Sequence, residues 1–226
     1  MERVSRNLRI DSFTARILSR RWFSPTTFEL TLERPAGFDF QPGQRVRLWS
    51  GLNEREYSIA AAPGDPDVVL CIRRVGSGGG SAWLSTAGIG TELRGSGPHG
   101  YFTFKPSPRP AIFVATGTGV APFVSMARAG TKGFTLLHGV KRAEDLFYRD
   151  LLSASAQRYM ACLSEDASAD PTVFAGRVTQ HLERQVPPGA CDFYLCGRSE
   201  MIRDVTWLVD DRFPGSRVYS EIFFGD

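Results

Sequence analysis

Residues 111–122 read AIFVATGTGVAP, an unbroken apolar run that ends directly in a glycine turn. Such a run is typical of a buried strand in a parallel sheet, and glycines at a strand-to-helix turn let a dinucleotide pyrophosphate approach the backbone. The turn lacks the complete GxGxxG pattern, because Pro122 stands where the third glycine would be. A tight turn without a ligand is the alternative. The candidate nucleotide-binding residues of the turn are Gly117, Thr118, Gly119 and Pro122.

The segments after this turn repeat the same alternation. Further apolar runs occur at 134–140 (FTLLHGV) and 193–197 (FYLCG), and we expect helices at 142–154 and 199–210. Strands that alternate with helices predict a parallel α/β sheet.

The residues before the apolar run follow a different pattern. From Phe13 to Phe104, short β-branched or aromatic runs are separated by Pro and Gly, which predicts a small antiparallel barrel or sandwich. These runs are FELTLERP, RVRLWS, REYSIA, VVLCIRRV and GYFTF. Residues 105–110 (KPSPRP) then hold three prolines, which neither a helix nor a central strand tolerates. We therefore expect a two-domain α+β protein, with an antiparallel β-barrel domain at 1–106 and an α/β parallel-sheet domain at 107–226.

The composition excludes several classes of protein. With 42% hydrophobic and 23% charged residues in 226, the chain has ordinary globular usage, so it can bury a normal core. No apolar run approaches the roughly 18 residues that span a bilayer, and the N-terminus lacks the apolar stretch of a secretory signal. We expect no membrane span and a cytoplasmic location.

The charge is slightly uneven along the chain. Residues 1–106 hold 14 Lys and Arg against 10 Asp and Glu, whereas the remaining residues hold 13 against 14. This basic first half can steer an acidic partner. A basic helix or an aromatic-interleaved basic stripe is missing from the sequence, so nucleic acid is not an expected partner.

The cysteines and histidines do not follow a metal-binding pattern. Four cysteines without dense spacing indicate thiols in a reducing compartment. Cys191 and Cys196 have the spacing of half a plant-type iron–sulfur site, but Ser199 stands where the next cysteine is needed. The three histidines also lack ligand spacing. We expect neither a cluster nor a metal.

Residues 55–58 read Arg-Glu-Tyr-Ser and suit a flavin nucleotide. Strand alternation puts Arg55 and Tyr57 on one face and Ser58 on the other. A guanidinium can hold a phosphate through two hydrogen bonds, and the tyrosine ring can cover a flat surface. The alternative is a surface ion pair beside a barrel aromatic.

A second phosphate-binding candidate is the glycine run 78–80, followed by SAWLS. The sequence predicts a helix that begins on a glycine-rich turn, with Ser81 near its N-terminus. Free N–H groups at such a turn bind phosphate. The alternative is a flexible loop with a serine N-cap.

Taken together and in this order, the fragments resemble the ferredoxin–NADP reductase superfamily over nearly the whole chain. The resemblance matches the family's Arg-x-Tyr-Ser flavin motif to Arg55, Tyr57 and Ser58. It matches the family's strand and phosphate turn to 70–75 and 79–81, and its nicotinamide-nucleotide turn to 117–122. The flavin-nucleotide residues that it adds are Ile72, Arg73, Gly79, Gly80 and Ser81.

Two later segments fit the same resemblance. Residues 194–197 (YLCG) look like the family's Cys-Gly motif, in which Cys196 lies beside the nicotinamide carbon that gives up hydride. Residues 221–223 (EIF) resemble the C-terminal Glu-x-aromatic motif, whose ring lies on the flavin until nicotinamide displaces it and whose carboxylate joins Ser58 in the proton path. The implied catalytic residues are Ser58, Cys196, Glu221 and Phe223, with Gly197 and Met201 among the cofactor-binding residues.

The end of the chain departs from the typical photosynthetic enzyme, which stops on its aromatic residue. Here the sequence continues with Phe224, Gly225 and Asp226. Phe223 and Phe224 are therefore both candidates for the ring that shields the flavin.

The resemblance implies FAD in the barrel and NAD(P)H on the second domain. Hydride would pass from the nicotinamide to the flavin, and single electrons would pass to an acidic ferredoxin, a flavodoxin or an oxygenase component. NADP-using relatives commonly grip the 2′-phosphate with a Ser-Arg pair after the third strand of this domain, where this chain has LSED at 163–166. Glu165 can instead accept a bond from a free ribose hydroxyl. We expect NADH rather than NADPH, with a phosphate contact from Lys141 or Arg142 as the alternative.

Two other functions remain open at this point. One is a flavin or quinone reductase (a diaphorase) that needs no protein acceptor. The other is an FAD-binding electron-transfer subunit of a larger complex. We expect a monomer.

Overall fold

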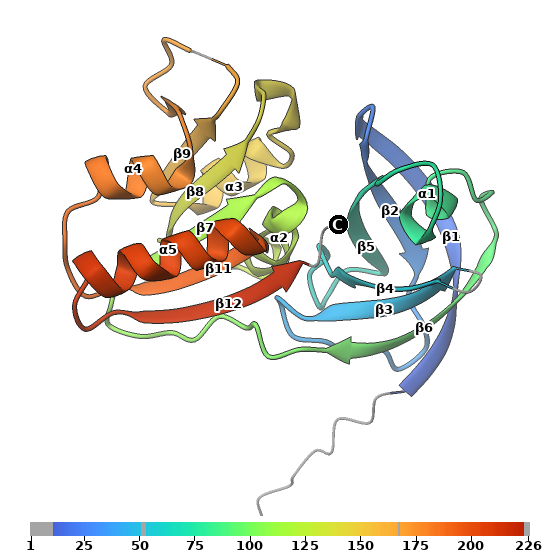
Figure 1. The fold of residues 1–226 in the computed structure, drawn as a ribbon. Coiled ribbons are helices and arrows are strands. Elements are labelled where there is room, and N and C mark those ends of the chain that lie inside the picture. The colour runs from blue at the N-terminus through green and yellow to red at the C-terminus, as the bar shows by residue number, and fades with distance from the viewer. Residues whose placement is uncertain (1–10, 51–52, 167, 224–226) are drawn as a thin grey trace, which may run out of the picture.

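The computed structural model describes residues 11–50, 53–166 and 168–223, whose strands form two six-stranded sheets (Figure 1). The first sheet is antiparallel, in the order β4-β3-β6-β1-β2-β5. Its strands are β1 (Asp11–Ser24), β2 (Thr27–Glu33), β3 (Arg45–Ser50), β4 (Asn53–Ser58), β5 (Asp67–Arg73) and β6 (Glu92–His99).

The two edges of the first sheet meet and close it into a barrel. Ile59, directly after β4, forms a bridge with Leu70 on β5, and Ala60 donates its N–H to the carbonyl oxygen of Val69 at 2.7 Å. Inward residues such as Phe28 and Leu48 fill the interior, which also buries Leu84 of the short helix α1 (Gly80–Leu84). This arrangement confirms the predicted antiparallel β-barrel.

One predicted barrel strand is wrong. Residues 100–104 (GYFTF) form no strand, and the strand at this point in the chain is β6, whose sequence ELRGSGPH has low β-propensity. A Cβ at Gly95 would overlap the ring of Phe13 on β1. The close approach of β1 and β6 thus favours glycine where a typical strand has a branched residue.

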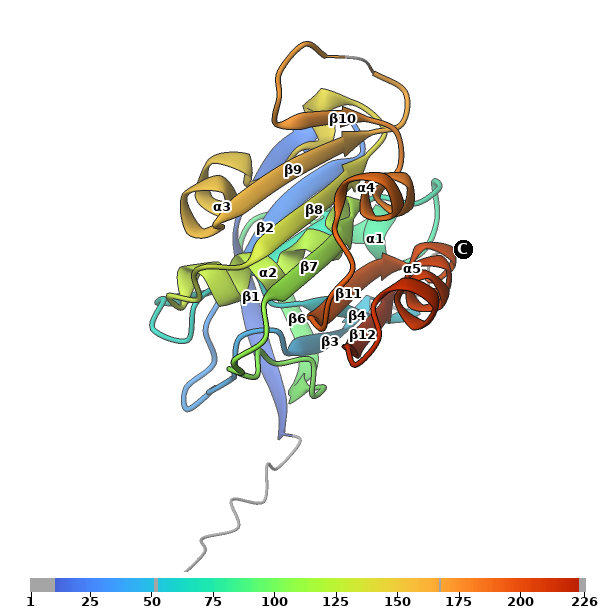
Figure 2. The same cartoon turned by 90° about the vertical axis from the view of Figure 1, so that its left-hand side faces the viewer.

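The second sheet is wholly parallel, in the order β10-β9-β8-β7-β11-β12. The helices α2 and α3 cover one face and α4 and α5 cover the other, as Figure 2 shows. This confirms the predicted α/β domain. Its strands are β7 (Ala111–Thr116), β8 (Thr135–Val140), β9 (Arg158–Leu163), β10 (Val173–Ala175), β11 (Asp192–Arg198) and β12 (Arg217–Phe223). Its helices are α2 (Ala121–Arg128), α3 (Arg149–Ser155), α4 (Val178–Gln185) and α5 (Ser199–Arg212), with 3₁₀ turns η1 (Gly117–Val120) and η2 (Ala143–Asp145).

The helix expected at 142–154 is interrupted, whereas the one expected at 199–210 is present as α5. Tyr148 lies between η2 and α3 with φ 58, a left-handed conformation that an α-helix cannot continue. Its hydroxyl donates to Glu29 on the barrel at 2.7 Å, and its ring packs on Phe23. A contact between domains therefore overrides the local helical pattern.

The two domains share a continuous apolar core. Barrel residues Ala60, Cys71 and Phe102 pack in the same cluster as Phe113 and Phe123 of the α/β domain. The carboxyl end of β12 points at the barrel in Figure 1. The boundary predicted after residue 106 lies in the connection between β6 and β7, and its position stays a prediction.

Within the described ranges, no helix combines the length and apolar character needed to cross a membrane. All four cysteines are buried and free.

Candidate active site

Ser58 of the barrel and Glu221 of the α/β domain form a hydrogen bond across the interface of the two domains. Ser58 is the last residue of β4, and Glu221 lies near the end of β12. The Ser58 hydroxyl donates to Glu221 Oε2 at 3.1 Å, and both side chains are buried. The resemblance predicted this pair, and the fold places the two residues in contact.

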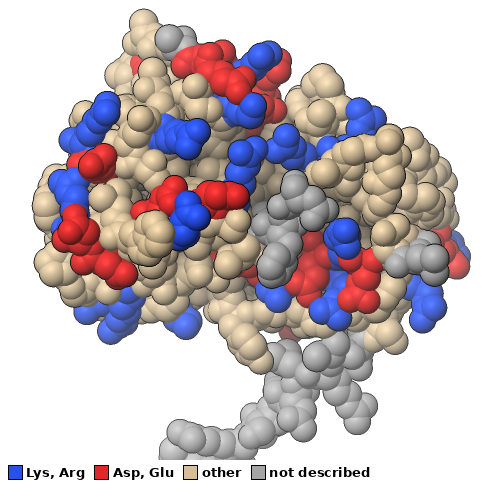
Figure 3. All heavy atoms as spheres, viewed as in Figure 1, with Lys and Arg blue, Asp and Glu red and all other residues tan. Residues whose placement is uncertain are grey.

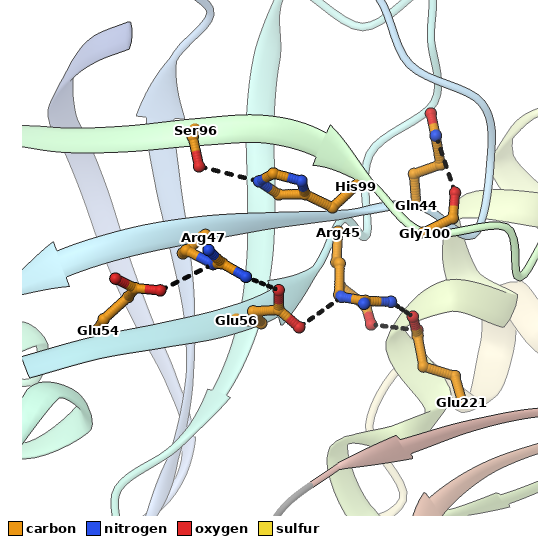
Figure 4. Close-up of polar contacts among 10 residues, drawn as sticks. Gln44, Arg45, Arg47, Glu54, Glu56, Ser96, His99, Gly100 and Glu221 are labelled. Atoms are coloured by element: carbon orange, nitrogen blue, oxygen red, sulfur yellow. Dashed lines mark hydrogen bonds and ion pairs between the residues drawn. The ribbon is translucent and has the colours of Figure 1, made fainter. Parts of the chain in front are cut away.

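Arg45 is a third member of this cluster, and it was missed from the sequence. It is the register partner of Ser58 on the neighbouring strand β3, so the two side chains lie on the same face of the sheet. Arg45 Nη1 donates to Glu221 Oε1 at 2.5 Å and Arg45 Nε donates to Glu56 Oε2 at 2.6 Å, so the guanidinium lies between two carboxylates (Figure 4). The alternation in RVRLWS signals only that Arg45 and Arg47 share a face.

The charges continue away from Glu221 along β3 and β4. Arg47 Nη2 donates to Glu56 Oε1 at 2.9 Å, and Arg47 Nε lies 3.0 Å from Glu54 Oε1. Acidic and basic side chains therefore alternate from the barrel surface to the buried Glu221, as Figure 4 shows. We call Glu54, Arg47, Glu56, Arg45 and Glu221 the charge ladder.

The two carboxyl groups that contact Arg45 differ in acidity. Burial raises the pKa of Glu221, and the charge and hydrogen bond of Arg45 and the hydroxyl of Ser58 offset part of that rise. Burial acts in the same direction on Glu56, but its contacts with Arg47 and Arg45 outweigh it and lower the pKa of Glu56. Of these two carboxyl groups, Glu221 is thus the one that takes up a proton first as the pH falls.

Cys196 lies next to Glu221 in the sheet. The two residues are register partners on β11 and β12, and Cys196 is completely buried. Burial, followed by the charge of Glu221, raises the pKa of the Cys196 thiol well above its usual value. The side chain is therefore a neutral thiol that can contribute a small apolar surface but not a thiolate.

The glycine turn after β7 lies against the same strand end. A Cβ at Gly119 would overlap the carbonyl oxygen of Cys196, and a Cβ at Gly197 would overlap the hydroxyl of Thr116. The backbones of η1 and of the end of β11 can approach this closely only because both residues are glycine. Gly117, with φ 54, opens the turn, and Pro122 lies in the first turn of α2.

The two proposed flavin-nucleotide motifs also meet. A Cβ added at Gly80 would lie 3.5 Å from Arg55 Cγ, so the arginine stem lies beside the glycine at which α1 begins. Arg55 is exposed, and the hydrogen bond found for its guanidinium is to the carbonyl oxygen of the adjacent Glu54. The hydroxyl of Tyr57 is buried without a hydrogen-bond partner among the described residues, and burial raises its pKa to about 12.

The remaining residues of the phosphate-turn motif have different surroundings. Ile72 is buried in the barrel core and Arg73 is exposed at the end of β5. The Ser81 hydroxyl accepts a hydrogen bond from the N–H of Val75 at 3.1 Å, and the N-cap of α1 is Gly79 rather than Ser81.

Met201 and Glu165 lie away from the cluster around Glu221. Met201, on α5, is buried on the sheet face opposite to Cys196. Glu165, after β9, is exposed and paired with Lys141 Nζ at 2.6 Å and Arg142 Nε at 3.5 Å. Phe224 lies outside the described residues. The backbone of Phe223 ends β12, paired with Arg198.

Known proteins with similar sequences decide the family. A family model described as an oxidoreductase NAD-binding domain matches residues 113–206. Ferredoxin–NADP reductase B of Sorangium cellulosum is 43% identical over 223 residues, covering 86% of this chain and 90% of the relative. This chain belongs to the ferredoxin–NADP reductase family.

Two further relatives define the extent of the family likeness. The reductase is 34% identical to the toluate 1,2-dioxygenase electron transfer component of Pseudomonas putida, but it spans only 63% of that relative's length. A ferredoxin–NADP⁺ reductase of Neisseria gonorrhoeae, solved with FAD and NADP, has the same fold, with a TM-score of 0.80 at 22% identity, covering 94% of this chain and 99% of the other.

The reductase is an oxidoreductase with FAD- and NAD(P)-binding domains, and its own residues fit both groups. The exposed guanidinium of Arg55 beside a glycine turn suits a pyrophosphate, and the orphaned hydroxyl of Tyr57 is available to a bound group. The tight packing of Gly119 on Cys196 keeps side chains away from the nicotinamide-nucleotide turn.

Proposed function

We propose that this reductase takes hydride from NADH and passes single electrons to a separate ferredoxin, flavodoxin or oxygenase component. The observation that carries the proposal is the contact between the two domains at Glu221. There Ser58 of the barrel donates to Glu221 of the nucleotide domain, beside Cys196. Bound FAD supplies the redox chemistry, because it accepts hydride and releases electrons one at a time.

The residues of the chain bind and orient the two nucleotides. Arg55 and the turn of Gly79, Gly80 and Ser81 hold the FAD pyrophosphate, and Tyr57 lines the flavin side. Ile72, whose side chain lies in the barrel core, contributes its backbone, and Arg73 lies at the nucleotide. On the second domain, the turn of Gly117, Thr118, Gly119 and Pro122 holds the NADH pyrophosphate. Cys196 and Gly197 pack against the nicotinamide, and Met201 packs on the opposite face of the same sheet. Phe223 or Phe224 covers the flavin. Aligning the two rings and excluding water is the protein's part in the hydride step.

Ser58 and Glu221 handle the proton. When Glu221 is ionised, the Ser58 hydroxyl donates its hydrogen bond to the Glu221 carboxylate. Glu221 therefore receives a proton that passes through Ser58 Oγ. Because burial raises the pKa of Glu221, this carboxyl can exchange a proton at a less acidic pH than an exposed glutamate.

The preference for NADH rests on Glu165. Its carboxylate can accept a hydrogen bond from a free ribose hydroxyl. The two nearby cations that could attract a 2′-phosphate, Lys141 and Arg142, are already paired with Glu165. A steady-state comparison of NADH and NADPH tests this part of the proposal, and a higher kcat/KM for NADPH contradicts it.

The charges on the protein surface are relevant to the kind of electron acceptor that can bind there. Basic and acidic side chains are interspersed over both domains on the face in Figure 3, including the barrel beside the junction. Among the described residues, this face has no patch of a single charge sign that would select an acidic protein acceptor. The second candidate is therefore a diaphorase that reduces small quinones or flavins. The FAD-binding subunit of a larger complex stays the third possibility.

Salt dependence separates a protein acceptor from a small one. Charges more than about 10 Å apart are screened at 0.1 M salt, so electron transfer to an acidic ferredoxin should slow as salt rises, whereas transfer to a neutral quinone should not. Equal salt dependence for both acceptors, or turnover with the quinone alone, contradicts a ferredoxin-like partner. The proposal also includes a monomeric state and a cytoplasmic location. The four free buried thiols support the location, because free thiols are typical of a reducing compartment.

A further inference from the structure

Arg45 contacts Glu221 but belongs to none of the sequence motifs that contain Ser58, Cys196 and Glu221. It reaches Glu221 through Nη1 and Glu56 through Nε, and its own side chain is only partly exposed. Because Arg45 and Ser58 are register partners, they approach Glu221 from neighbouring strands. Each carboxylate oxygen of Glu221 therefore has its own donor, Arg45 at Oε1 and Ser58 at Oε2.

We propose that Arg45 is a positioning residue that holds the Glu221 carboxylate in the orientation in which Ser58 must donate its hydroxyl proton to it. The inference rests on the proposed function, because the direction of this hydrogen bond matters only if Ser58 serves a bound flavin.

The donors and acceptors of the three side chains fix this direction. An arginine side chain has five N–H donors and no acceptor, and an ionised carboxylate only accepts. The charge of Arg45 at Oε1 favours the ionised form of Glu221 against the opposing effect of burial, and in that form the single proton of Ser58 is committed to Oε2. The Ser58 oxygen then keeps a lone pair that can accept a hydrogen bond from an N–H of the cofactor. A protonated Glu221 would instead be able to donate to Ser58 and reverse this direction.

Glu56 fixes the orientation of Arg45. The distance of 2.6 Å from Arg45 Nε to Glu56 Oε2 holds one edge of the guanidinium, while Arg47 holds the other oxygen of Glu56 at 2.9 Å. Charge-assisted contacts of this kind are short and directional. The direct contact with Glu56 thus holds Arg45 from the barrel side, so that its Nη1 stays on Glu221.

The groups that face Glu221 come from three neighbouring strands. They are Arg45 from β3, Ser58 and the more distant Glu56 from β4, and the neutral thiol of Cys196 from β11. His99, at the end of β6, interacts with Arg45, Arg47 and Glu56 and has its ring hydrogen-bonded to Ser96. Among these described groups, Arg45 is the cation in direct contact with Glu221, so its removal should change the acidity of Glu221 more than any other single change.

The test measures the pKa of Glu221 directly in the FAD-loaded protein. Side-chain carboxyl ¹³C signals are titrated in protein labelled at glutamate, and the signal lost in Glu221→Gln identifies the residue. Arg45→Met should raise the pKa of Glu221 by about one to three pH units, because an adjacent opposite charge lowers a carboxyl pKa by that amount. Arg45→Lys, which keeps the charge, should restore most of the difference.

Arg47→Met is the matched control. It removes a guanidinium from the same strand and the same face, but Arg47 contacts Glu54 and Glu56 and not Glu221. Its effect on the Glu221 titration should be less than about half a pH unit. Equal shifts in Arg45→Met and Arg47→Met would overturn the proposal. If Arg45→Met fails to fold, Arg45→Gln carries the same expectation.

A kinetic measurement links the position of Arg45 to the reaction. The pH profile of flavin reduction by NADH in a single turnover should move upward in Arg45→Met together with the Glu221 titration. In the Glu221→Gln background, Arg45→Met should cause no further movement, and an undiminished effect there would also overturn the proposal. The carboxyl titration does not need turnover. A protein that NADH cannot reduce, but in which Arg45 still governs Glu221, refutes the proposed function and leaves the positioning intact.

Discussion

The hydroxyl of Ser58, in the barrel, donates a hydrogen bond to the carboxylate of Glu221, in the nucleotide domain, over 3.1 Å. Neither domain contains the pair alone, so the site exists only where the barrel meets the carboxyl end of the parallel sheet. Ligands of open α/β sheets bind at that end of the strands.

Removing either member of this pair should slow the hydride step. We expect Ser58→Ala and Glu221→Gln each to lower the rate of flavin reduction by about 100-fold, the usual contribution of a positioned acid or base. Stopped-flow reduction by NADH measures this rate. Glu92→Gln is the control, since Glu92 is exposed and pairs with Arg16 on the barrel surface. Rates equal to that of the control would contradict a role for the pair.

Gly119 should be intolerant of any side chain. In Gly119→Ala the new Cβ would meet the carbonyl oxygen of Cys196, so the nucleotide turn must move away from β11. A misplacement of about 1 Å can cost a factor of 100, and we expect kcat/KM for NADH to fall at least about tenfold. Gly64→Ala, with nothing within 4 Å of the added Cβ, should leave kcat/KM unchanged. The same small effect in both variants would contradict this packing.

Nucleotide choice should respond to the charge of Glu165. Glu165→Gln removes the partner of Lys141 and Arg142 and leaves both cations available to a 2′-phosphate. We expect the ratio of kcat/KM for NADPH over NADH to rise by about tenfold, equivalent to ~1.4 kcal/mol. The exposed Glu183→Gln is the control. An unchanged ratio of kcat/KM in Glu165→Gln would mean that the 2′ position of the bound nucleotide does not lie beside Glu165.

His138 should make the protein sensitive to acid. It is completely buried on β8, and burial lowers its pKa to about 4. Between pH 6.5 and 4 the unfolded chain takes up a proton at His138 that the folded protein does not, so the free energy of unfolding falls as the pH falls through this window. The maximal slope is about 1.4 kcal/mol per pH unit for one group.

Urea unfolding at about pH 6.5 and about pH 4.5 tests this. His138→Gln should lose about 2 kcal/mol less than the unsubstituted protein over that interval. His181, whose pKa burial also lowers to about 4, should retain its own part of the acid sensitivity in this variant. Identical losses in both proteins would mean that His138 is charged in the folded state.

The sequence predicted those parts of the fold whose signals are local. The run 111–116 and its glycine turn gave the central strand β7 and the turn η1 because periodicity and glycine position carry that information. Strand β6 was missed because Gly95 is required by the ring of Phe13, a neighbour about 80 residues away in sequence. The break before α3 was missed for a similar reason, since Tyr148 is held by Glu29 of the other domain.

The candidate site divides in the same way. Arg55, Tyr57, Ser58 and Glu221 belong to motifs that a family resemblance can find. Arg45 could not be found in this way, because its role depends on the register of β3 with β4 and on the approach of β12. An arginine in an alternating strand is normally a solvated surface residue, and the fold alone turns it towards a buried carboxylate.

Transfer of hydride from NADH to a bound flavin is tested by an anaerobic titration of the purified, FAD-loaded protein with NADH, followed by its visible spectrum. We expect the yellow absorbance of the flavin to bleach to completion with about one equivalent of NADH, since one hydride carries the two electrons that FAD accepts. A flavin spectrum that stays unchanged in excess NADH would contradict the proposed reaction and favour an FAD-binding subunit that depends on another protein for its electrons.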